Sequence, residues 1–334
     1  LKGNKTIYMY YCGNYYNYCY GTLANRTGII KIFDVIKYGD GFLIRYPSSK
    51  EPTKMPEFHE TKKLAWALEE FEKIHSVLDV LTVYKLNKAI EEDRIKDVIM
   101  LAEALHEKKI ANIADDIAKR KNVKMVLIAG PSSSGKTSFA TRLSIHLKVN
   151  NLNPISISLD NYFIDRDKTP LDEFGKLDYE SINAINLERF NKDLKDLLEG
   201  KKVQLPRYNF ITGKSEAGEI LQIEKNQPII LEGIHGLNPI LTASIPDDEK
   251  FKIYLSALTQ LNLDDHNRIP TTDLRLIRRI VRDNQFRGHT AEMTIMGWPS
   301  VRRGEEKNIF PYQEEADVMF NTACVYELAL LKTY

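Results

Sequence analysis

The chain of 334 residues is 43% hydrophobic and 28% charged, which is typical of a globular protein and excludes a disordered or fibrous one. Its 47 Lys and Arg residues against 46 Asp and Glu residues give a formal net charge of +1, which excludes a global basic surface for nucleic acid or anionic lipid. The 3 cysteines cannot form a disulfide framework, and no run of about 18 uncharged apolar residues is present to span a bilayer. We therefore expect a cytoplasmic protein with no membrane partner.

Both ends of the chain predict that it is part of a longer polypeptide. It begins with Leu1 rather than Met, and it ends at Tyr334 inside an apolar helical pattern that includes Leu328 and Leu331.

Residues 1–58 are predicted to form a small strand region rich in tyrosine, with seven tyrosines within residues 8–20. The runs Ile29–Phe33 and Phe42–Tyr46 are rich in β-branched and aromatic residues, and Tyr38–Gly41 supplies a glycine turn between them. Crowded aromatic rings also occur on base-stacking surfaces. Because few basic residues lie nearby, we interpret the tyrosines as packing of a small sheet.

Residues 59–122 are predicted to be helical and to complete an N-terminal α+β region. From Thr61 the apolar residues recur at three and four positions, as on the buried face of a helix. Two more amphipathic helices are predicted within Leu86–Lys119, where charged residues between the apolar ones would face water. We place a domain boundary between residues 122 and 123, where an apolar strand pattern begins.

A phosphate-binding loop follows the apolar run Met125–Ala129, which is predicted to be a buried strand. The segment Gly130–Thr137 reads GPSSSGKT and matches G-x-x-x-x-G-K-[ST] at every fixed position. Its glycines let backbone N–H groups close around phosphate oxygens, the Lys136 ammonium reaches the terminal phosphates, and the Thr137 hydroxyl can bind Mg²⁺. Helical spacing over 138–149 predicts a helix whose N-terminal dipole also faces the phosphates. The predicted nucleotide-binding residues are Gly130, Ser132, Ser133, Ser134, Gly135, Lys136 and Thr137.

Two further apolar runs end in carboxylates. Pro154–Leu159 runs into Asp160. Likewise Pro228–Leu231 runs into Glu232, so both acids lie at the carboxyl ends of predicted strands. Because P-loop proteins hold an acid for Mg²⁺ or its water shell at such a position, Thr137 and Glu232 are the predicted metal-binding pair. Either acid alone could equally be a surface residue or a helix cap. Together with the phosphate-binding loop, the two acids indicate one site. Two more strands are predicted at Phe251–Leu255 and Asp317–Phe320.

An arginine-rich helix is predicted at Arg275–Gly288. Phosphoryl transfer needs cations that offset the charge on the transferred group, and this segment holds five arginines, several of which share one helix face. A solvated charged helix is the alternative, but the nearby neutralising acids are limited to Asp273 and Asp283. Residues 123–334 are thus predicted to be an α/β domain with a P-loop-type parallel sheet, flanking helices and an arginine-bearing helix.

With these motifs in place, Lys124–Asn321 resembles the uridine kinase family, a branch of the P-loop kinases that includes phosphoribulokinase. The resemblance implies ATP-dependent phosphorylation of a nucleoside 5′-hydroxyl, within an α/β fold whose parallel sheet carries a lid over the nucleotide. It rests on seven motifs in one order, namely GPSSSGKT (130–137), SLDNYF (158–163), LDYESINAINL (177–187), VQLPRYNF (203–210), IILEGIHGL (229–237), RRIVRDNQFRG (278–288) and ADV (316–318).

The resemblance also implies roles for single residues. Asp160 matches the family's general base, which orients the acceptor hydroxyl and can take its proton. Glu232 matches a magnesium-site acid, Asp178 a contact to ribose hydroxyls, and Tyr208 a position near the acceptor pocket. The implied catalytic residues are Asp160, Lys136, Arg279, Arg282 and Arg287, of which Arg282 also binds nucleotide; the implied acceptor-binding residues are Asp160, Asp178, Tyr208 and Arg279.

Departures from the family pattern fall on positions that read the base. Asn209 stands where the P-x-Y-D-F motif has Asp, and Gly213 stands near a usual His. Beyond the lid, His289 replaces an Arg and Gly297 replaces a Gln. A site without its hydrogen-bond partners loses discrimination by orders of magnitude, so we expect an altered or relaxed base preference.

The N-terminal third resembles the segment that precedes the kinase in uridine kinase-like proteins fused to threonyl-tRNA-synthetase-type accessory domains. This match rests on GFLIRYP at Gly41–Pro47 and on the helical stretch that follows. The paired-histidine motif of such accessory domains is not visible in the sequence, so editing or tRNA chemistry is unsupported.

The leading hypothesis is a nucleoside kinase that uses ATP and Mg²⁺ and acts on a small-molecule acceptor. One alternative is a P-loop kinase of another small alcohol, such as a sugar phosphate or a pantothenate-like acceptor. A second alternative is a regulatory module that binds ATP but transfers nothing. Its RNA-associated form is disfavoured by the near-neutral charge, and a homo-oligomer is compatible with the sequence.

Overall fold

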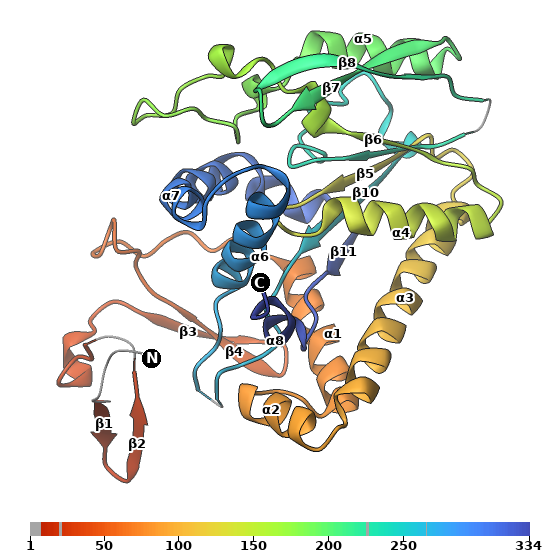
Figure 1. Ribbon diagram of the computed structural model, residues 1–334. Coiled ribbons are helices and arrows are strands. Elements are labelled where there is room, and N and C mark those ends of the chain that lie inside the picture. The colour runs from red at the N-terminus through yellow and green to blue at the C-terminus, as the bar shows by residue number, and fades with distance from the viewer. Residues whose placement is uncertain (1–7, 20–21, 225–226, 265) are drawn as a thin grey trace. The chain divides into compact units, whose positions relative to one another are not determined.

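The computed structural model describes residues 8–19, 22–224, 227–264 and 266–334, with the backbone alone for residues 71–76 (Figure 1). The chain forms two compact units, Leu1–Glu60 and Thr61–Tyr334. Among the described residues, no helix combines the length and the apolar character needed to cross a bilayer.

The smaller unit holds two antiparallel hairpins, β1 (Met9–Cys12) with β2 (Tyr15–Tyr18) and β3 (Asp34–Tyr38) with β4 (Gly41–Arg45). The second predicted strand is confirmed by β4. The first predicted strand, Ile29–Phe33, is wrong, because the strand that pairs with β4 is β3, which begins directly after Phe33. The turn between Tyr38 and Gly41 is only two residues long, so the partner strand must end directly at the turn.

Two of the tyrosines pack against each other through their rings. Tyr11 and Tyr16 face each other across the first hairpin, with ring centroids 5.9 Å apart. Both rings remain more than half exposed, so they do not form a core. Tyr20 lies outside the described residues.

The larger unit is built on one parallel sheet with strand order β11-β10-β5-β9-β6. All five strands were predicted, and the α/β fold class is confirmed. Ile128 of the central strand and Ser158 of the edge strand both pair with Glu232, so the strand ends that carry the predicted acids meet at one edge. The bounds are β5 (Met125–Ala129), β6 (Ile155–Ser158), β9 (Ile229–Glu232), β10 (Lys250–Ser256) and β11 (Val318–Asn321).

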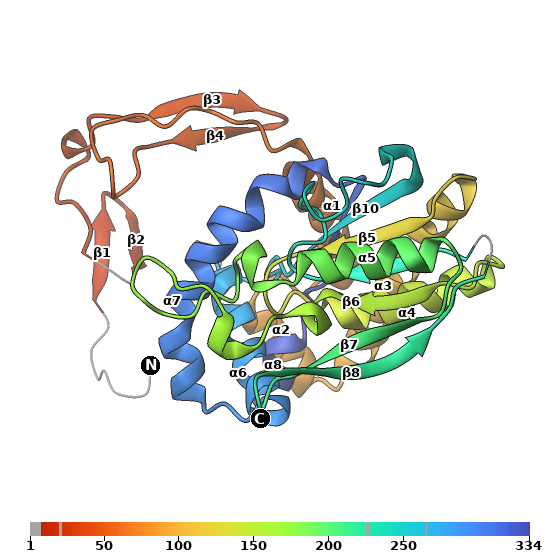
Figure 2. The ribbon, with the colours of Figure 1, turned by 90° about the horizontal axis from the view of Figure 1, so that it is seen from above.

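Helices cover both faces of this sheet, because alternate residues of β5 point to opposite sides (Figure 2). Val126 and Ile128 pack with α3 and α4, whereas Met125 and Leu127 pack on the side of α5. A hairpin of β7 (Val203–Asn209) and β8 (Lys214–Leu221) lies beside α5. The helices are α1 (Lys62–Leu78), α2 (Val83–Glu91), α3 (Ile95–Lys119), α4 (Lys136–Val149), α5 (Leu187–Leu198), α6 (Thr271–Phe286), α7 (Ala291–Asn308) and α8 (Glu327–Leu331).

The helices before the phosphate-binding loop belong to the larger unit, which differs from the predicted boundary after residue 122. The reason lies in α3, where Ile110, Ile113 and Ile117 are buried in the same cluster as Val126 and Ile128 of the central strand. The helical pattern was predicted correctly. The spacing of the residues does not show which part of the protein the apolar face of α3 covers.

Replacing Ile117 tests whether α3 supports the sheet. Ile117→Ala should lower the free energy of unfolding by about 2–5 kcal/mol, because the side chain is 1% exposed and its loss leaves a cavity. Met100→Ala on the same helix is the matched control, since Met100 is 70% exposed and a change of about 0.5 kcal/mol or less is expected. Urea unfolding measures both, and equal small losses would contradict the packing of α3 on the sheet.

Candidate active site

The loop between β5 and α4 is shaped by its two glycines. A Cβ on Gly130 would lie 2.3 Å from the carbonyl oxygen of Leu255, so no larger residue fits there. Gly135 has φ of +82° and caps α4, a conformation that glycine adopts without strain. The Lys136 Nζ atom donates to the carbonyl oxygens of Gly130 at 3.0 Å and Pro131 at 3.2 Å. The ammonium is therefore folded back over the loop.

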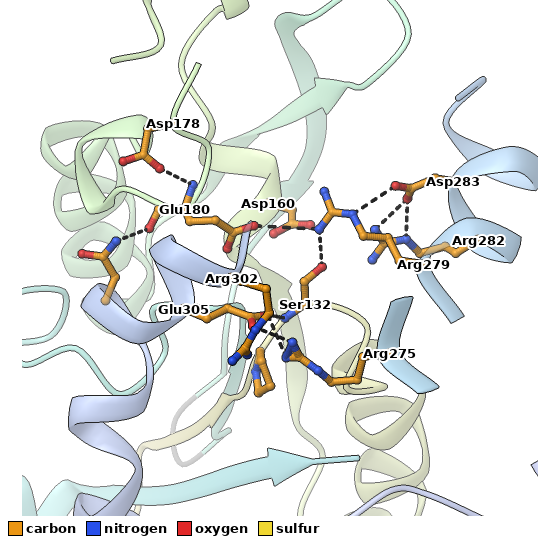
Figure 3. A network of polar contacts seen from close by, with 12 residues as sticks. Ser132, Asp160, Asp178, Glu180, Arg275, Arg279, Arg282, Asp283, Arg302 and Glu305 are labelled. Carbon is orange, nitrogen blue, oxygen red and sulfur yellow. Dashed lines mark hydrogen bonds and ion pairs between the residues drawn. The ribbon is translucent and has the colours of Figure 1, made fainter. Parts of the chain in front are cut away.

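Side chains from the C-terminal part of the chain hold this loop from outside (Figure 3). The Ser132 N–H donates to Oε1 of Glu305 at 3.0 Å, and Arg279 Nη1 donates to the Ser132 hydroxyl at 2.6 Å. Thr322 Oγ1 donates to the carbonyl oxygen of Ser134 at 2.7 Å. The predicted role of the loop amides therefore does not extend to Ser132, whose N–H is already bound to a carboxylate.

Two pockets meet at the loop. The larger, of about 540 Å³, runs from Thr137 toward α3 and α8, and the smaller, of about 210 Å³, lies on the side of the aromatic residues Tyr208 and Phe210. The residues that line both are Lys136, Asp160, Arg282 and Arg287.

Most of the predicted site residues line one of these pockets. Those lining only the larger are Ser133, Gly135, Thr137 and Glu232, and those lining only the smaller are Ser132, Tyr208 and Arg279. Gly130 and Ser134 are buried residues of the loop itself, and they line neither pocket. Asp178 also lines neither, because its Oδ1 atom accepts the N–H of Glu180 at 3.1 Å and closes a turn.

Thr137 and Glu232 form a pair of oxygen groups beside the loop. Thr137 Oγ1 donates to Glu232 Oε1 at 3.2 Å. Burial raises the pKa of Glu232 and nearby Asp160 adds to the rise, whereas Lys136 opposes it. Hydroxyl and carboxylate oxygens are the ligands that Mg²⁺ prefers, and a cation would relieve the repulsion between the two acids. The pair therefore fits a magnesium ion.

Three arginines of the predicted lid contact one buried acid, Asp283. Arg282 Nη2 donates to Asp283 Oδ1 at 2.7 Å, and Arg279 Nε lies 3.3 Å from Oδ2 of the same carboxylate. Arg287 Nε lies 3.8 Å from Asp283 Oδ1, and its Nη2 atom lies 3.4 Å from Asp160 Oδ2. Asp283 was read only as a neutralising charge. Its spacing of four residues from both Arg279 and Arg287 is the signal that predicts this contact.

Arg275, one of the five arginines of this segment, does not line either pocket. It is 1% exposed, and its two terminal nitrogens contact Glu305 at 2.7 and 2.5 Å. Arg302 Nη1 contacts the same carboxylate at 2.9 Å. Glu305 thus joins α6, α7 and the loop, and nothing in the sequence pattern singled it out.

Two of the residues that depart from the family pattern, Asn209 and Gly213, have structural explanations. Asn209 closes the β7–β8 turn, where its Oδ1 atom accepts the N–H groups of Ile211 and Thr212. Gly213 has φ of +70°, and a Cβ there would lie 2.7 Å from Nε of Arg166. The Arg166 side chain lines the smaller pocket at this position, so arginine occupies the space beside Gly213.

The fold and the loop define a P-loop kinase: a phosphate-binding loop follows the central strand of a parallel sheet, with acids at neighbouring strand ends and arginines opposite. The model of the Phosphoribulokinase / Uridine kinase family matches residues 125–329, and the chain belongs to this family.

Relatives with known names are similar over the same region. "Uridine kinase" of Ligilactobacillus salivarius (strain UCC118) is 31% identical over 205 residues, which is 61% of this chain and 87% of the relative. "Uridine kinase" of Macrococcus caseolyticus (strain JCSC5402) is 31% identical over 196 residues, which is 58% of this chain and 84% of the relative. A solved structure from Bacillus stearothermophilus aligns at 17% identity with a TM-score of 0.41, over 64% of this chain and 100% of that one.

The first prediction from the site concerns Glu305. Glu305→Ala should lower the free energy of unfolding by about 3–5 kcal/mol, because Arg275 is left buried without its partner. The neighbouring Glu306→Ala is the matched control, since Glu306 is 58% exposed and pairs with Arg302 at 3.5 Å. A change of about 0–1 kcal/mol is expected for it in the same urea titration. Equal losses in both variants would show that the buried network adds no stability.

The second prediction concerns Glu180, which is 7% exposed and lines the smaller pocket. Burial raises its pKa from an ordinary value of 4.5 to about 7, although Arg279 opposes the rise. Because the folded state holds this proton more tightly than the unfolded state, its contribution to stability is present below the ordinary value and is lost as pH rises through about 7.

Glu180→Gln should therefore gain about 3 kcal/mol of unfolding free energy relative to the parent protein between pH values of about 5 and 8. Urea titrations at both pH values measure this difference. The control is Glu173→Gln, since Glu173 is 70% exposed. A gap between Glu180→Gln and the parent protein that stays constant with pH would show that Glu180 does not titrate in this range.

Proposed function

We propose that this chain transfers the γ-phosphoryl group of ATP to the 5′-hydroxyl of a nucleoside, with Mg²⁺ as cofactor. The observation that carries the proposal is the meeting of two pockets at Lys136 and Asp160. A kinase must hold two substrates so that the donor phosphoryl group and the acceptor oxygen come together. Both pockets are lined by Lys136, which phosphate binding requires, and by Asp160, which could accept the proton.

The larger pocket suits the triphosphate. The loop amides after Ser132, the Lys136 ammonium and the N-terminus of α4 surround its inner end, and all of them favour negative charge. Thr137 and Glu232 would hold Mg²⁺ there. ATP supplies the phosphoryl group, and the metal ion offsets its negative charge.

Asp160 would act as the general base. It lies directly after β6, lines both pockets and points its Oδ2 atom toward Arg287. There it would orient the acceptor hydroxyl and accept its proton as the new bond to phosphorus forms. Arg279, Arg282 and Arg287 would offset the charge that spreads over the transferred group.

The smaller pocket favours an acceptor with a planar ring. Phe163, Tyr179, Tyr208 and Phe210 line it, and the ring centroids of Tyr208 and Phe210 lie 5.1 Å apart. Such a wall stacks with a base, which supports a nucleoside over a sugar phosphate or a pantothenate-like acceptor. The names of the relatives support the same substrate class. Arg166 and His289 line this pocket in place of the usual base-reading groups, which supports an altered base preference.

Asp160→Asn tests the proposal. ADP release from Mg·ATP with the best acceptor of a panel of ribonucleosides, sugar phosphates and pantothenate should fall by about 10²–10⁴-fold, while ATP binding persists. Lys136→Ala should also abolish turnover, because the phosphates lose their cation. Asp167→Asn should leave turnover unchanged, since Asp167 lines neither pocket and pairs with Lys214 at 3.0 Å.

The panel also separates the alternatives. If the protein phosphorylates a sugar phosphate or pantothenate and no nucleoside, that alcohol takes the place of the nucleoside as the proposed substrate. ATP binding without any ADP release across the panel would favour the regulatory module.

A further inference from the structure

The far end of the larger pocket is walled by a helix that precedes the kinase fold. Glu103 and His106 of α3 line this end, together with residues that follow β11 such as Cys324. The family model matches residues 125–329, whereas α3 already ends at Lys119. This wall of the pocket therefore comes from a part of the chain that lies outside the region that defines the family.

The place of the transferred phosphoryl group decides which part of ATP reaches this wall. Lys136 and Asp160 line both pockets, so the transfer must occur where the two pockets meet. The rest of ATP then extends into the part of the larger pocket that the smaller pocket does not share. That part runs from Thr137 toward α3. Its volume of about 540 Å³ lies within the usual range for pockets that enclose a small-molecule ligand.

His106 presents an uncharged ring at this end of the pocket. Burial lowers the pKa of the imidazole, so the ring is neutral at pH 7 and is not a cation for phosphate. Its centroid lies 5.3 Å from the ring centroid of Phe320, and its Nδ1 atom lies 3.8 Å from Sγ of Cys324. Phe139 supports the same Phe320 ring at 4.8 Å. A neutral ring with aromatic support suits contact with a heterocyclic base.

Glu103 ties this wall to the elements on either side of it. The Tyr326 hydroxyl, after β11, donates to Glu103 Oε1 at 2.5 Å. Arg142 Nη2, on α4, lies 3.5 Å from Glu103 Oε2. Residues three apart lie on the same face of a helix, so these contacts also fix the place of His106. Glu103 is thus a positioning residue for the ring.

We propose that the base of ATP stacks on the His106 ring, so that α3 completes the nucleotide site of the kinase fold. This inference rests on the proposed kinase function. It assigns a task in substrate binding to the helical segment ahead of the phosphate-binding loop, besides the task of covering the sheet through Ile117.

The test compares two ligands by titration calorimetry, Mg·ATP and magnesium tripolyphosphate, which has three phosphates but no base. His106→Ala should weaken ATP binding by about 5–50-fold, because the base loses its stacking partner. Affinity for tripolyphosphate should change by less than about 2-fold, since the phosphate-binding loop is left intact. Equal losses for both ligands, or no loss for ATP, would overturn the inference.

Two further variants separate a contact with the base from the packing of α3. His106→Phe keeps a flat ring, so ATP affinity should stay within about 3-fold of the parent protein. His146→Ala should leave both affinities unchanged. It removes a 2.7 Å contact between His146 Nε2 and Glu107 Oε2, which joins α4 to α3 without lining either pocket. A loss of ATP affinity in either variant as large as in His106→Ala would overturn the stacking contact.

ADP release with the acceptor panel separates this inference from the kinase function. ATP binding that depends on His106, without ADP release for any acceptor, would support the inference and overturn the kinase function. ADP release with an ATP affinity that is unchanged in His106→Ala would do the reverse. Absence of ATP binding in the parent protein would overturn both.

Discussion

The hydrogen bonds of the buried Glu305 carboxylate hold the rest of the site in position. It accepts the Ser132 N–H from the phosphate-binding loop, two nitrogens of Arg275 from α6 and one of Arg302 from its own helix, α7. A buried charge is tolerated only when donors surround it, so these elements must keep their relative positions for the network to persist. The loop, α6 and α7 are thus held together as one framework (Figure 3). Glu180 packs against α7 at Gly304.

Within that framework the cations of the site face acids of the same chain. Arg287 faces Asp160, Arg282 faces Asp283, and burial lowers the pKa of Lys136 while Glu232 opposes the change. These contacts hold the cations in place before a phosphate is present. An anionic ligand competes with the acids for the same cations, and such preorganised charges act strongly in a site shielded from water.

Local sequence patterns located the strands of the parallel sheet and the phosphate-binding loop, but not the long-range partners of the side chains. The apolar runs located all five strands of the parallel sheet, and the GPSSSGKT motif located the loop, because both signals lie within a few consecutive residues. Glu305 escaped notice because it contacts residues 173 and 30 positions away, and buried ion pairs over such separations leave no periodic trace. The same limit applies to α3 and to Glu180. The spacing showed that α3 has an apolar face, but tertiary packing decided that the face covers the kinase sheet.

The contact between Gly304 and Glu180 has a mechanical consequence. Because the backbone of α7 lies directly against the side-chain stem of Glu180, the helix cannot move inward without displacing that carboxylate. One wall of the smaller pocket therefore rests directly on the backbone of α7. A substitution that shifts α7 would also reshape the smaller pocket, and a larger side chain at position 304 would alter that pocket without lying in it.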